Sequence, residues 1–277
     1  MNGAESLVHT LADCGVRLCF ANPGTSEMHF VAALDREPRL RGVLCLFEGV
    51  AAGAADGYAR MTGTPAATLL HLGPGFANAM SHLHNARKAG TPLINIVGDH
   101  ATTHAQYAQA PLSSDILGIC RPVSDWLHQC RSPGEVAAEQ QQRALAADGA
   151  RAVAAALMAP GQVATLVLPA DCAWQDADGP AAPLPVPKAR PVEAGRIDTV
   201  AAALKNGKRT LLLLRGRCLE RAGLEAAGRI AARTGARIAH DYFSPRITRG
   251  AGLPAIERIP YFGEEIVARL AGLEQIV

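Results

Sequence analysis

The sequence predicts an α/β protein: a parallel sheet with helices on both faces, followed by a partial second α/β domain. Short apolar runs alternate along the chain with longer segments whose apolar residues recur at helical spacing. Strands that are apolar along their whole length are buried on both sides, which is typical of a parallel sheet covered by helices. A proline-rich segment interrupts this pattern, and the same alternation begins again after it.

In the first part of the chain, the elements follow one another as helix, strand, helix, strand. Helical spacing predicts helices over residues 4–14, 26–34, 49–61, 73–87 and 133–158. Apolar runs predict strands over residues 16–21, 42–47, 66–70, 92–97 and 163–168. The segment between Gly98 and the last of these helices is expected to be a long loop.

Residues 176–195 contain five prolines and no apolar periodicity, so we expect them to form an extended linker. This linker divides the chain into a predicted first domain over 1–175 and an incomplete second domain over 196–277. The second domain is expected to contain helices over 196–205, 219–234 and 264–270, with strands over 210–214, 237–240 and from 273 to the last residue.

Composition and charge exclude several classes of protein. The formal net charge is +2 and the basic residues are dispersed, so no nucleic-acid footprint is present. The seven cysteines never form a CxxC pair, which favours buried, reduced thiols and a cytoplasmic location. The first residues lack the pattern of a secretory signal, and no apolar run is long enough to span a bilayer.

Glu48 stands where the strand over 42–47 passes into a helix made almost wholly of alanine and glycine. A helix-capping role is the ordinary explanation, because the positive end of the helix dipole favours a negative group. However, the small side chains of this helix indicate that another backbone packs closely against it. A carboxyl beside such an interface would be partly desolvated, which favours its protonated form and suits it to proton transfer.

Other polar residues also follow predicted strands, and in parallel sheets ligands bind at the carboxyl ends of the strands. The turn Asn22-Pro23-Gly24 and His71 both occupy such positions. The loop Gly73-Pro74-Gly75 is not a dinucleotide-binding fingerprint, because Asn78 stands at the third glycine position. An NAD-binding protein is therefore a distant alternative.

An ordered set of motifs carries a resemblance to a known family. The motifs are NPGT from Asn22, Glu48 with GVAAGAADGYAR, HLGPGFAN from His71 and LINIVGD from Leu93. Together they resemble the pyrimidine-binding domain of thiamine-diphosphate enzymes of the acetolactate synthase and benzoylformate decarboxylase superfamily. The resemblance covers about residues 1–172, and the part after the linker resembles the beginning of that family's central domain.

The resemblance implies a role for each motif. In the family, a glutamate hydrogen-bonds to N1′ of the cofactor aminopyrimidine and promotes formation of a thiazolium carbanion, and Glu48 matches that glutamate. The turn Asn22-Pro23-Gly24 would run past the aminopyrimidine, although such a sequence is also common turn chemistry. The loop that contains Gly75 and Asn78 would line the cofactor site.

His71 distinguishes two branches of the family. Acetolactate synthases usually have a small residue there, whereas the benzoylformate decarboxylase branch has a histidine, which could relay protons to the substrate. A histidine satisfied by backbone groups is the alternative. Phe47 also replaces a histidine common in acetolactate synthases, so the resemblance casts doubt on acetolactate synthesis as the reaction.

The resemblance places the metal site outside this chain. Family members hold the diphosphate and Mg²⁺ through a Gly-Asp-Gly motif in a C-terminal domain, whereas here Gly98-Asp99 is followed by His100. We therefore expect no metal ligand in this chain. His100 and His104 are a weak metal pattern and are better explained as a polar loop. FAD binding is possible in the family but has no support here.

The function expected from the resemblance is a thiamine-diphosphate-dependent 2-oxo acid decarboxylase or carboligase, of which this chain is the N-terminal portion and inactive alone. Its expected partners are a second copy, in a dimer or tetramer, or a chain carrying the diphosphate-binding domain. The small-residue helix, with Ala51, Ala52 and Ala55, is expected at that interface. A fragment, a subunit of a split enzyme, a non-catalytic remnant and an interaction module docking through this helix remain open alternatives.

Overall fold

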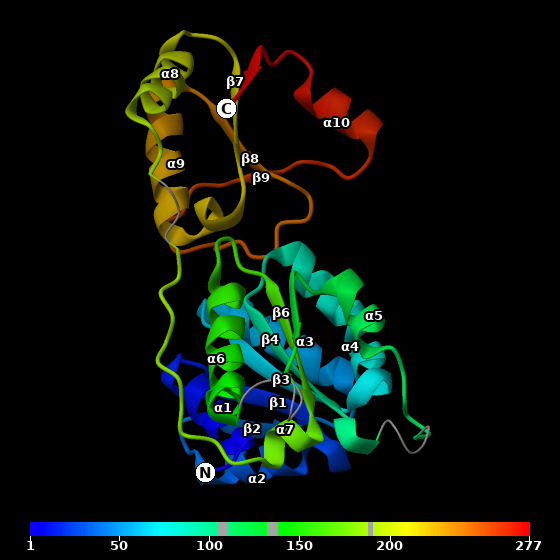
Figure 1. Cartoon of the computed structure of the whole chain (residues 1–277). Helices are drawn as coiled ribbons and strands as arrows, with labels where there is room; N and C mark the ends of the chain where they lie inside the picture. The colour runs from blue at the N-terminus through cyan, green and yellow to red at the C-terminus, as the bar shows by residue number, and fades with distance from the viewer. Residues whose placement is uncertain (105–109, 132–137, 188–190) are drawn as a thin grey trace. The chain divides into compact units, whose positions relative to one another are not determined.

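The structure, a computed structural model, describes residues 1–104, 110–131, 138–187 and 191–277, and the side chains of 138–142 are not included. The chain divides into two compact units, Met1–Lys188 and Ala189–Val277, which are drawn in Figure 1. Within the described ranges, no helix combines the length and apolarity that crossing a membrane requires.

Unit 1 is built on a six-stranded sheet with the order β2-β1-β3-β4-β6-β5, and all of its strand pairs are parallel. The strands are β1 (Leu18–Asn22), β2 (Arg41–Leu44), β3 (Ala66–Leu70), β4 (Leu93–Asp99), β5 (Trp126–Gln129) and β6 (Val163–Pro169). The predicted fold class is confirmed, because a parallel sheet is covered by helices on both faces.

Helices cover the two faces of this sheet because alternate strand residues point to opposite sides. In β3, Ala67 and Leu69 belong to one buried cluster, whereas Ala66 and Leu70 belong to the other. The first face carries α1 (Gly3–Asp13), α2 (Met28–Arg36), α6 (Ala138–Leu157) and α7 (Ala170–Trp174). The second carries α3 (Glu48–Thr62), α4 (Leu72–Ala89) and α5 (Ile116–Cys120) (Figure 1).

A buried polar ladder crosses the middle of the sheet. Thr68 and Thr165 lie opposite Asn95 on the two neighbouring strands. The Thr68 hydroxyl donates to Asn95 Oδ1 at 2.8 Å, and Asn95 Nδ2 donates to Thr165 Oγ1 at 3.0 Å. A slip of one residue in either pairing would leave these polar groups buried without partners, so the ladder favours one register.

The small-residue helix α3 packs inside this chain. Ala51, Ala52 and Ala55 are fully buried in the cluster that α3 shares with α4 and the sheet. The expectation that these three alanines form a subunit interface is therefore wrong, because α4 and the sheet already cover them. Val50 and Met61 lie on the exposed side of the helix.

The segment predicted as a long loop contains an additional strand. β5 (Trp126–Gln129) pairs with β6 at the edge of the sheet and is only half-buried, so it lacks the apolar run that marks the other strands. The segment also contains α5 and the short 3₁₀ helices η2 (Thr102–His104) and η3 (Arg121–Val123). The beginning of the predicted helix over 133–158 lies outside the described residues.

The predicted strand over 42–47 is shorter than expected. β2 ends at Leu44, and Leu46 is 90% exposed. Within the predicted linker, residues 177–187 and 191–193 form neither helix nor strand, whereas its last two residues begin the helix Ala194–Lys205. The first part of this segment is held against α1. The Ser6 hydroxyl donates to the Gly179 carbonyl at 2.6 Å, and the Ala181 amide donates to Thr10 Oγ1 at 3.0 Å.

Unit 2 contains a four-stranded sheet with the order β10-β7-β8-β9. Its elements are α8 (Ala194–Lys205), β7 (Thr210–Leu214), η4 (Gly216–Leu219), α9 (Arg221–Thr234), β8 (Arg237–His240), β9 (Glu257–Arg258), α10 (Gly263–Leu270) and β10 (Gln275–Ile276). The two-residue strand β9 was not predicted, because it has no apolar run. The core is small and centres on Leu219 and Leu224, whereas α8 has no buried side chain.

Candidate active site

The candidate site lies at the carboxyl edge of the unit 1 sheet, where β1, β3 and β4 are neighbours. Asn22 is the last residue of β1 and lies opposite Leu70, the last residue of β3. The half-buried Pro23 and Gly24 follow directly. The two turns that the sequence singled out, at Asn22 and at His71, therefore leave the sheet side by side.

Glu48 is the first residue of α3 and is 8% exposed. Its position at the helix N-terminus places its negative charge at the favourable end of the helix dipole. Asn78, one helix away, donates from Nδ2 to Glu48 Oε2 at 2.9 Å. The carboxyl is therefore buried, held by an amide and oriented toward α4 by that amide.

Gly75 lies between Glu48 and His71. A Cβ atom at Gly75 would be 2.9 Å from Glu48 Oε1 and 3.4 Å from His71 Cβ. The Gly75 amide donates to the His71 carbonyl at 2.9 Å in the first turn of α4. Only glycine leaves the Glu48 carboxyl in this place without a shift, which explains the second glycine of the GPG sequence at the start of the helix.

His71 leaves the sheet through a strained turn. It caps α4, and the next residue, Leu72, has φ of 56°. This left-handed conformation is rare for a leucine and costs about 1–3 kcal/mol. The Leu72 side chain is 1% exposed in the core, and its burial holds the turn in place.

Glu27, which the sequence analysis did not single out, is the closest polar partner of His71. Its Oε2 lies 2.8 Å from His71 Nδ1 and accepts the Gly24 amide at 2.7 Å. Its side chain is 1% exposed, and burial raises the pKa of this carboxyl. The available signal was a glutamate three residues after Gly24, which reads as a capping pattern at the 3₁₀ turn η1 (Thr25–Glu27).

Two glycines enclose the Glu27–His71 pair. A Cβ atom at Gly24 would lie 2.2 Å from His71 Cε1, so the backbone of the turn packs on the imidazole ring. A Cβ atom at Gly98 would lie 1.6 Å from Glu27 Oε1. Of the polar atoms in the described part of the chain, Oε1 is among the few that are buried without a hydrogen-bond partner.

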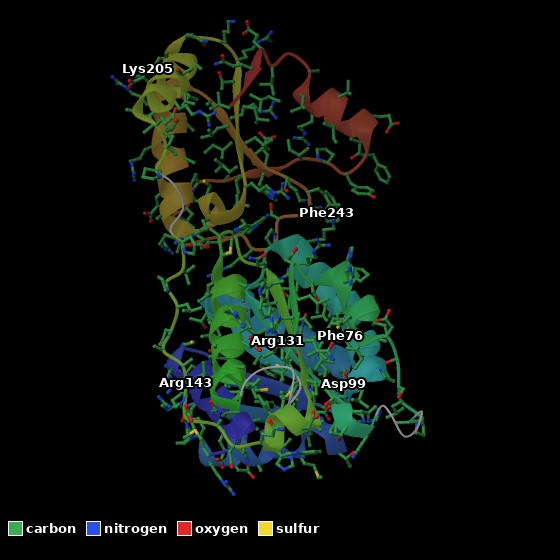
Figure 2. All side chains as sticks on the ribbon, viewed as in Figure 1. Phe76, Asp99, Arg131, Arg143, Lys205 and Phe243 are labelled. Atoms are coloured by element: carbon green, nitrogen blue, oxygen red, sulfur yellow. The ribbon has the colours of Figure 1, made fainter. Side chains whose placement is uncertain are left out.

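A second group of polar residues follows β4 and β6. Asp99, labelled in Figure 2, is the last residue of β4. Burial raises the pKa of its carboxyl, and its Oδ1 accepts the His100 amide at 2.7 Å. The Thr102 amide donates to Asp171 Oδ2 at 3.1 Å. Within the described ranges, no three histidine, cysteine or acidic side chains are grouped so that they could hold a metal ion. His104 is exposed.

The geometry therefore brings together the residues that the sequence singled out. Asn78 hydrogen-bonds to Glu48, Gly75 lies beside the same carboxyl, and Gly24 packs on His71. The role of each remains a prediction. Asn22 and Pro23 lie on the turn that leads to Gly24.

Comparison with known proteins supports this description. Residues 1–119 match the family described as thiamine pyrophosphate enzyme, N-terminal TPP binding domain. "Putative acetolactate synthase large subunit IlvX" of Mycobacterium tuberculosis is 49% identical over 278 residues, which cover 100% of this chain and 51% of that protein. Acetolactate synthase isozyme 3 large subunit of Escherichia coli is 36% identical over 123 residues, which cover 44% of this chain and 21% of that protein.

Solved structures share the fold. A "putative thiamin diphosphate-dependent enzyme" from Mycobacterium smegmatis is 26% identical, with a TM-score of 0.84 over 100% of this chain and 51% of its own. The thiamine diphosphate-dependent 4-hydroxybenzoylformate decarboxylase of Rhodococcus jostii RHA1 has a TM-score of 0.82 at 23% identity, with the same coverage. This chain thus spans about half the length of each protein it matches throughout. It contains the N-terminal domain of the thiamine-diphosphate enzyme superfamily.

Proposed function

We propose that unit 1 binds the aminopyrimidine ring of thiamine diphosphate and that Glu48 pairs with its N1′ atom. The observation that carries this proposal is the buried carboxyl at the start of α3, held by Asn78 with Gly75 beside it. A side chain on Gly75 would fill the space next to Oε1, so the glycine leaves one face of the carboxyl accessible to a flat ring.

The proposed chemistry of Glu48 is proton sharing. When bound, the cofactor supplies a nucleophilic thiazolium carbon and accepts electrons from the bond that breaks. Glu48 holds a proton at N1′, and the Asn78 amide keeps the carboxyl in one orientation while it does so. General acid–base groups of this kind contribute about 10²–10⁴-fold to rate.

We further propose that His71 exchanges a proton with a 2-oxo acid substrate. Its side chain is one-quarter exposed at the end of β3, separated from Glu48 by Gly75. An imidazole takes up and releases protons near neutral pH. The names of the relatives support a 2-oxo acid reaction, either decarboxylation or carboligation, and the histidine favours a decarboxylase.

The domain assignments belong to the same proposal: residues 1–175 bind the pyrimidine, 176–195 connect, and 196–277 belong to a central domain. The diphosphate and Mg²⁺ would be held by a domain outside these 277 residues, in a longer form of this polypeptide or in a separate chain. Exposed apolar residues beside Glu48 support such a partner, since Leu44 is 72%, Leu46 is 90% and Phe47 is 47% exposed. FAD has no supporting observation.

Calorimetry tests this proposal against a non-catalytic remnant or a pure interaction module. The protein is titrated with thiamine diphosphate and Mg²⁺, alone and together with a chain that carries a diphosphate-binding domain. Saturable heat that is lost in Glu48→Gln is the expected result. Glu37→Gln, which changes a buried carboxyl at the C-terminus of α2 that is paired with His9 and Arg39, is the matched control and should bind as the unaltered protein does. Equal binding by both variants would contradict the proposal.

A further inference from the structure

We propose that Glu27 is a positioning residue, which fixes the ring tautomer of His71 so that Nε2 faces the site as a proton acceptor. This inference rests on the proposed use of His71. It concerns a residue whose sequence signal is only that of a turn cap, and whose pairing with His71 depends on how η1, β3 and β4 come together.

The hydrogen bonds to one oxygen define the tautomer. Glu27 Oε2 accepts the Gly24 amide at 2.7 Å, and it lies 2.8 Å from His71 Nδ1. A backbone amide only donates, so Oε2 acts as an acceptor in this arrangement. When the same oxygen also accepts Nδ1–H, the neutral ring carries its proton on Nδ1 and leaves Nε2 free to accept one.

The surroundings hold both partners in place. The backbone of Gly24 packs on the His71 ring, and that of Gly98 packs on Glu27 Oε1. The carboxyl is 1% exposed, so water does not compete for its hydrogen bonds. Because the pair is enclosed from β1 on one side and β4 on the other, the imidazole has little freedom to flip.

A capping role alone does not account for this glutamate. The turn η1 has three residues, and capping the Gly24 amide requires a single acceptor oxygen. Glu5 caps Asn2 in the same pattern, with its second oxygen paired to Arg36. The Oε1 of Glu27, in contrast, has no hydrogen-bond partner in the described part of the chain, and an unsatisfied buried acceptor is destabilising. The pairing with His71 gives this buried carboxyl a function.

The arrangement has a direct consequence for proton transfer. When Nε2 takes a proton from a substrate group, the ring becomes an imidazolium whose Nδ1–H still faces the Glu27 carboxyl. An opposite charge at this distance stabilises the protonated ring without any movement of the side chains. Glu27 therefore acts through His71 and needs no contact with substrate.

Nitrogen-15 NMR of the histidine rings in the full 277-residue chain tests the inference without cofactor or activity. In the unaltered protein, neutral His71 should show a single tautomer protonated on Nδ1. Glu27→Ala should convert it to a mixture of the two tautomers, whereas Glu27→Gln keeps an acceptor oxygen and should retain the single form. The His9–Glu37 pair, with Nδ1 and Oε2 2.6 Å apart, is the internal control. Glu37→Ala should change His9 and leave His71 as it was.

A second variant guards against misfolding of Glu27→Ala. Gly98→Ala keeps the carboxyl but displaces Oε1, and it should also release the His71 tautomer. A single Nδ1–H tautomer that persists in both Glu27→Ala and Gly98→Ala would overturn the inference, as would an Nε2–H form in the unaltered chain. Activity is read separately in the complete enzyme. A mixed tautomer with unchanged turnover would support the positioning role and refute the catalytic use of His71. A turnover loss of roughly 10–100-fold would support both.

Discussion

A glutamate–histidine pair lies near each end of the parallel strands of unit 1, one at the carboxyl edge of the sheet and one at the opposite, amino edge. The two pairs have different surroundings. At the carboxyl edge, Glu27 lies 2.8 Å from His71, and on the segment leading into β2, Glu37 lies 2.6 Å from His9. Both carboxyl groups are almost fully buried. The two pairs are thus alike in their residue types, in the distance between nitrogen and oxygen, and in the burial of the carboxyl.

The charges around the two pairs differ. Arg39 donates to both oxygens of Glu37, at 2.8 Å from Nε and 2.6 Å from Nη2, and these bonds lower the pKa of Glu37 to about 2. Among the residues that the structure describes, no arginine or lysine is paired with Glu27, and burial raises its pKa. Arg39 thus stabilises the charged form of the first carboxyl, whereas burial disfavours the charged form of the second.

The largest effect that separates the two edges is expected from Glu48→Gln. In a complete enzyme, turnover on 2-oxo acids should fall about 10²–10⁴-fold, because an amide cannot share a proton with the cofactor ring. The unfolding midpoint should change little, since Gln still accepts from Asn78. Steady-state kinetics and denaturant unfolding measure the two quantities. More than a tenth of the original rate in the variant would show that Glu48 is not the activating group.

A smaller loss of turnover is expected from Gly75→Ala in the complete enzyme. The added Cβ would lie 2.9 Å from Glu48 Oε1, and the flexible carboxyl would move away rather than the backbone. A misplacement of this size costs up to about 10²-fold in rate, with folding preserved. Gly57→Ala, in open space on the exposed side of α3, is the control and should leave turnover unchanged. If both variants behaved alike, the close approach at Gly75 would have no functional meaning.

The opposite edge should respond in stability alone. Glu37→Gln removes the charge that receives Arg39 and is expected to lower the thermal midpoint by roughly 2–8 °C. The effect is limited because the Arg39 side chain is half-exposed. Turnover should stay at its original value. Calorimetric scans and activity assays on the same preparation check this, and a large loss of turnover would remove the distinction between the edges.

The smallest effect is a difference in pH dependence. The pKa of Glu27 in the native state lies above its ordinary value of 4.5. Between 4.5 and that native pKa, the native state binds more protons than the unfolded state, so stability falls as pH rises. Glu37 has the opposite sign: its contribution is complete above 4.5 and is lost as pH falls toward about 2. The unfolding free energies of Glu27→Gln and Glu37→Gln should therefore be compared with those of the unaltered protein from about pH 2 upward. Relative to the unaltered protein, Glu27→Gln should gain stability as pH rises above 4.5, and Glu37→Gln should lose stability as pH rises from about 2 to 4.5. Parallel curves would refute the assignment.

Much of the fold could be predicted because its signals are local. The strands over 66–70, 210–214 and 237–240 have the predicted bounds, since each is a short segment with apolar residues at its centre between helical segments. Trp126–Gln129 was missed because an edge strand that is half-buried needs no such run. The strained turn at Leu72 was also invisible, since a leucine with positive φ is held there by burial and not by its own preference.

The sequence by itself determined the class of sheet, the place of Glu48 at the start of a helix and the turn residues at the strand ends. These depend on periodicity and on residues that are adjacent in the chain. Only the tertiary structure decided which carboxyl meets which partner, because Glu27 and His71 are 44 positions apart and Glu48 and Asn78 are 30 apart. Whether a buried glutamate remains a fixed anion or takes part in proton transfer depends on the charges that distant elements bring within a few ångströms of it.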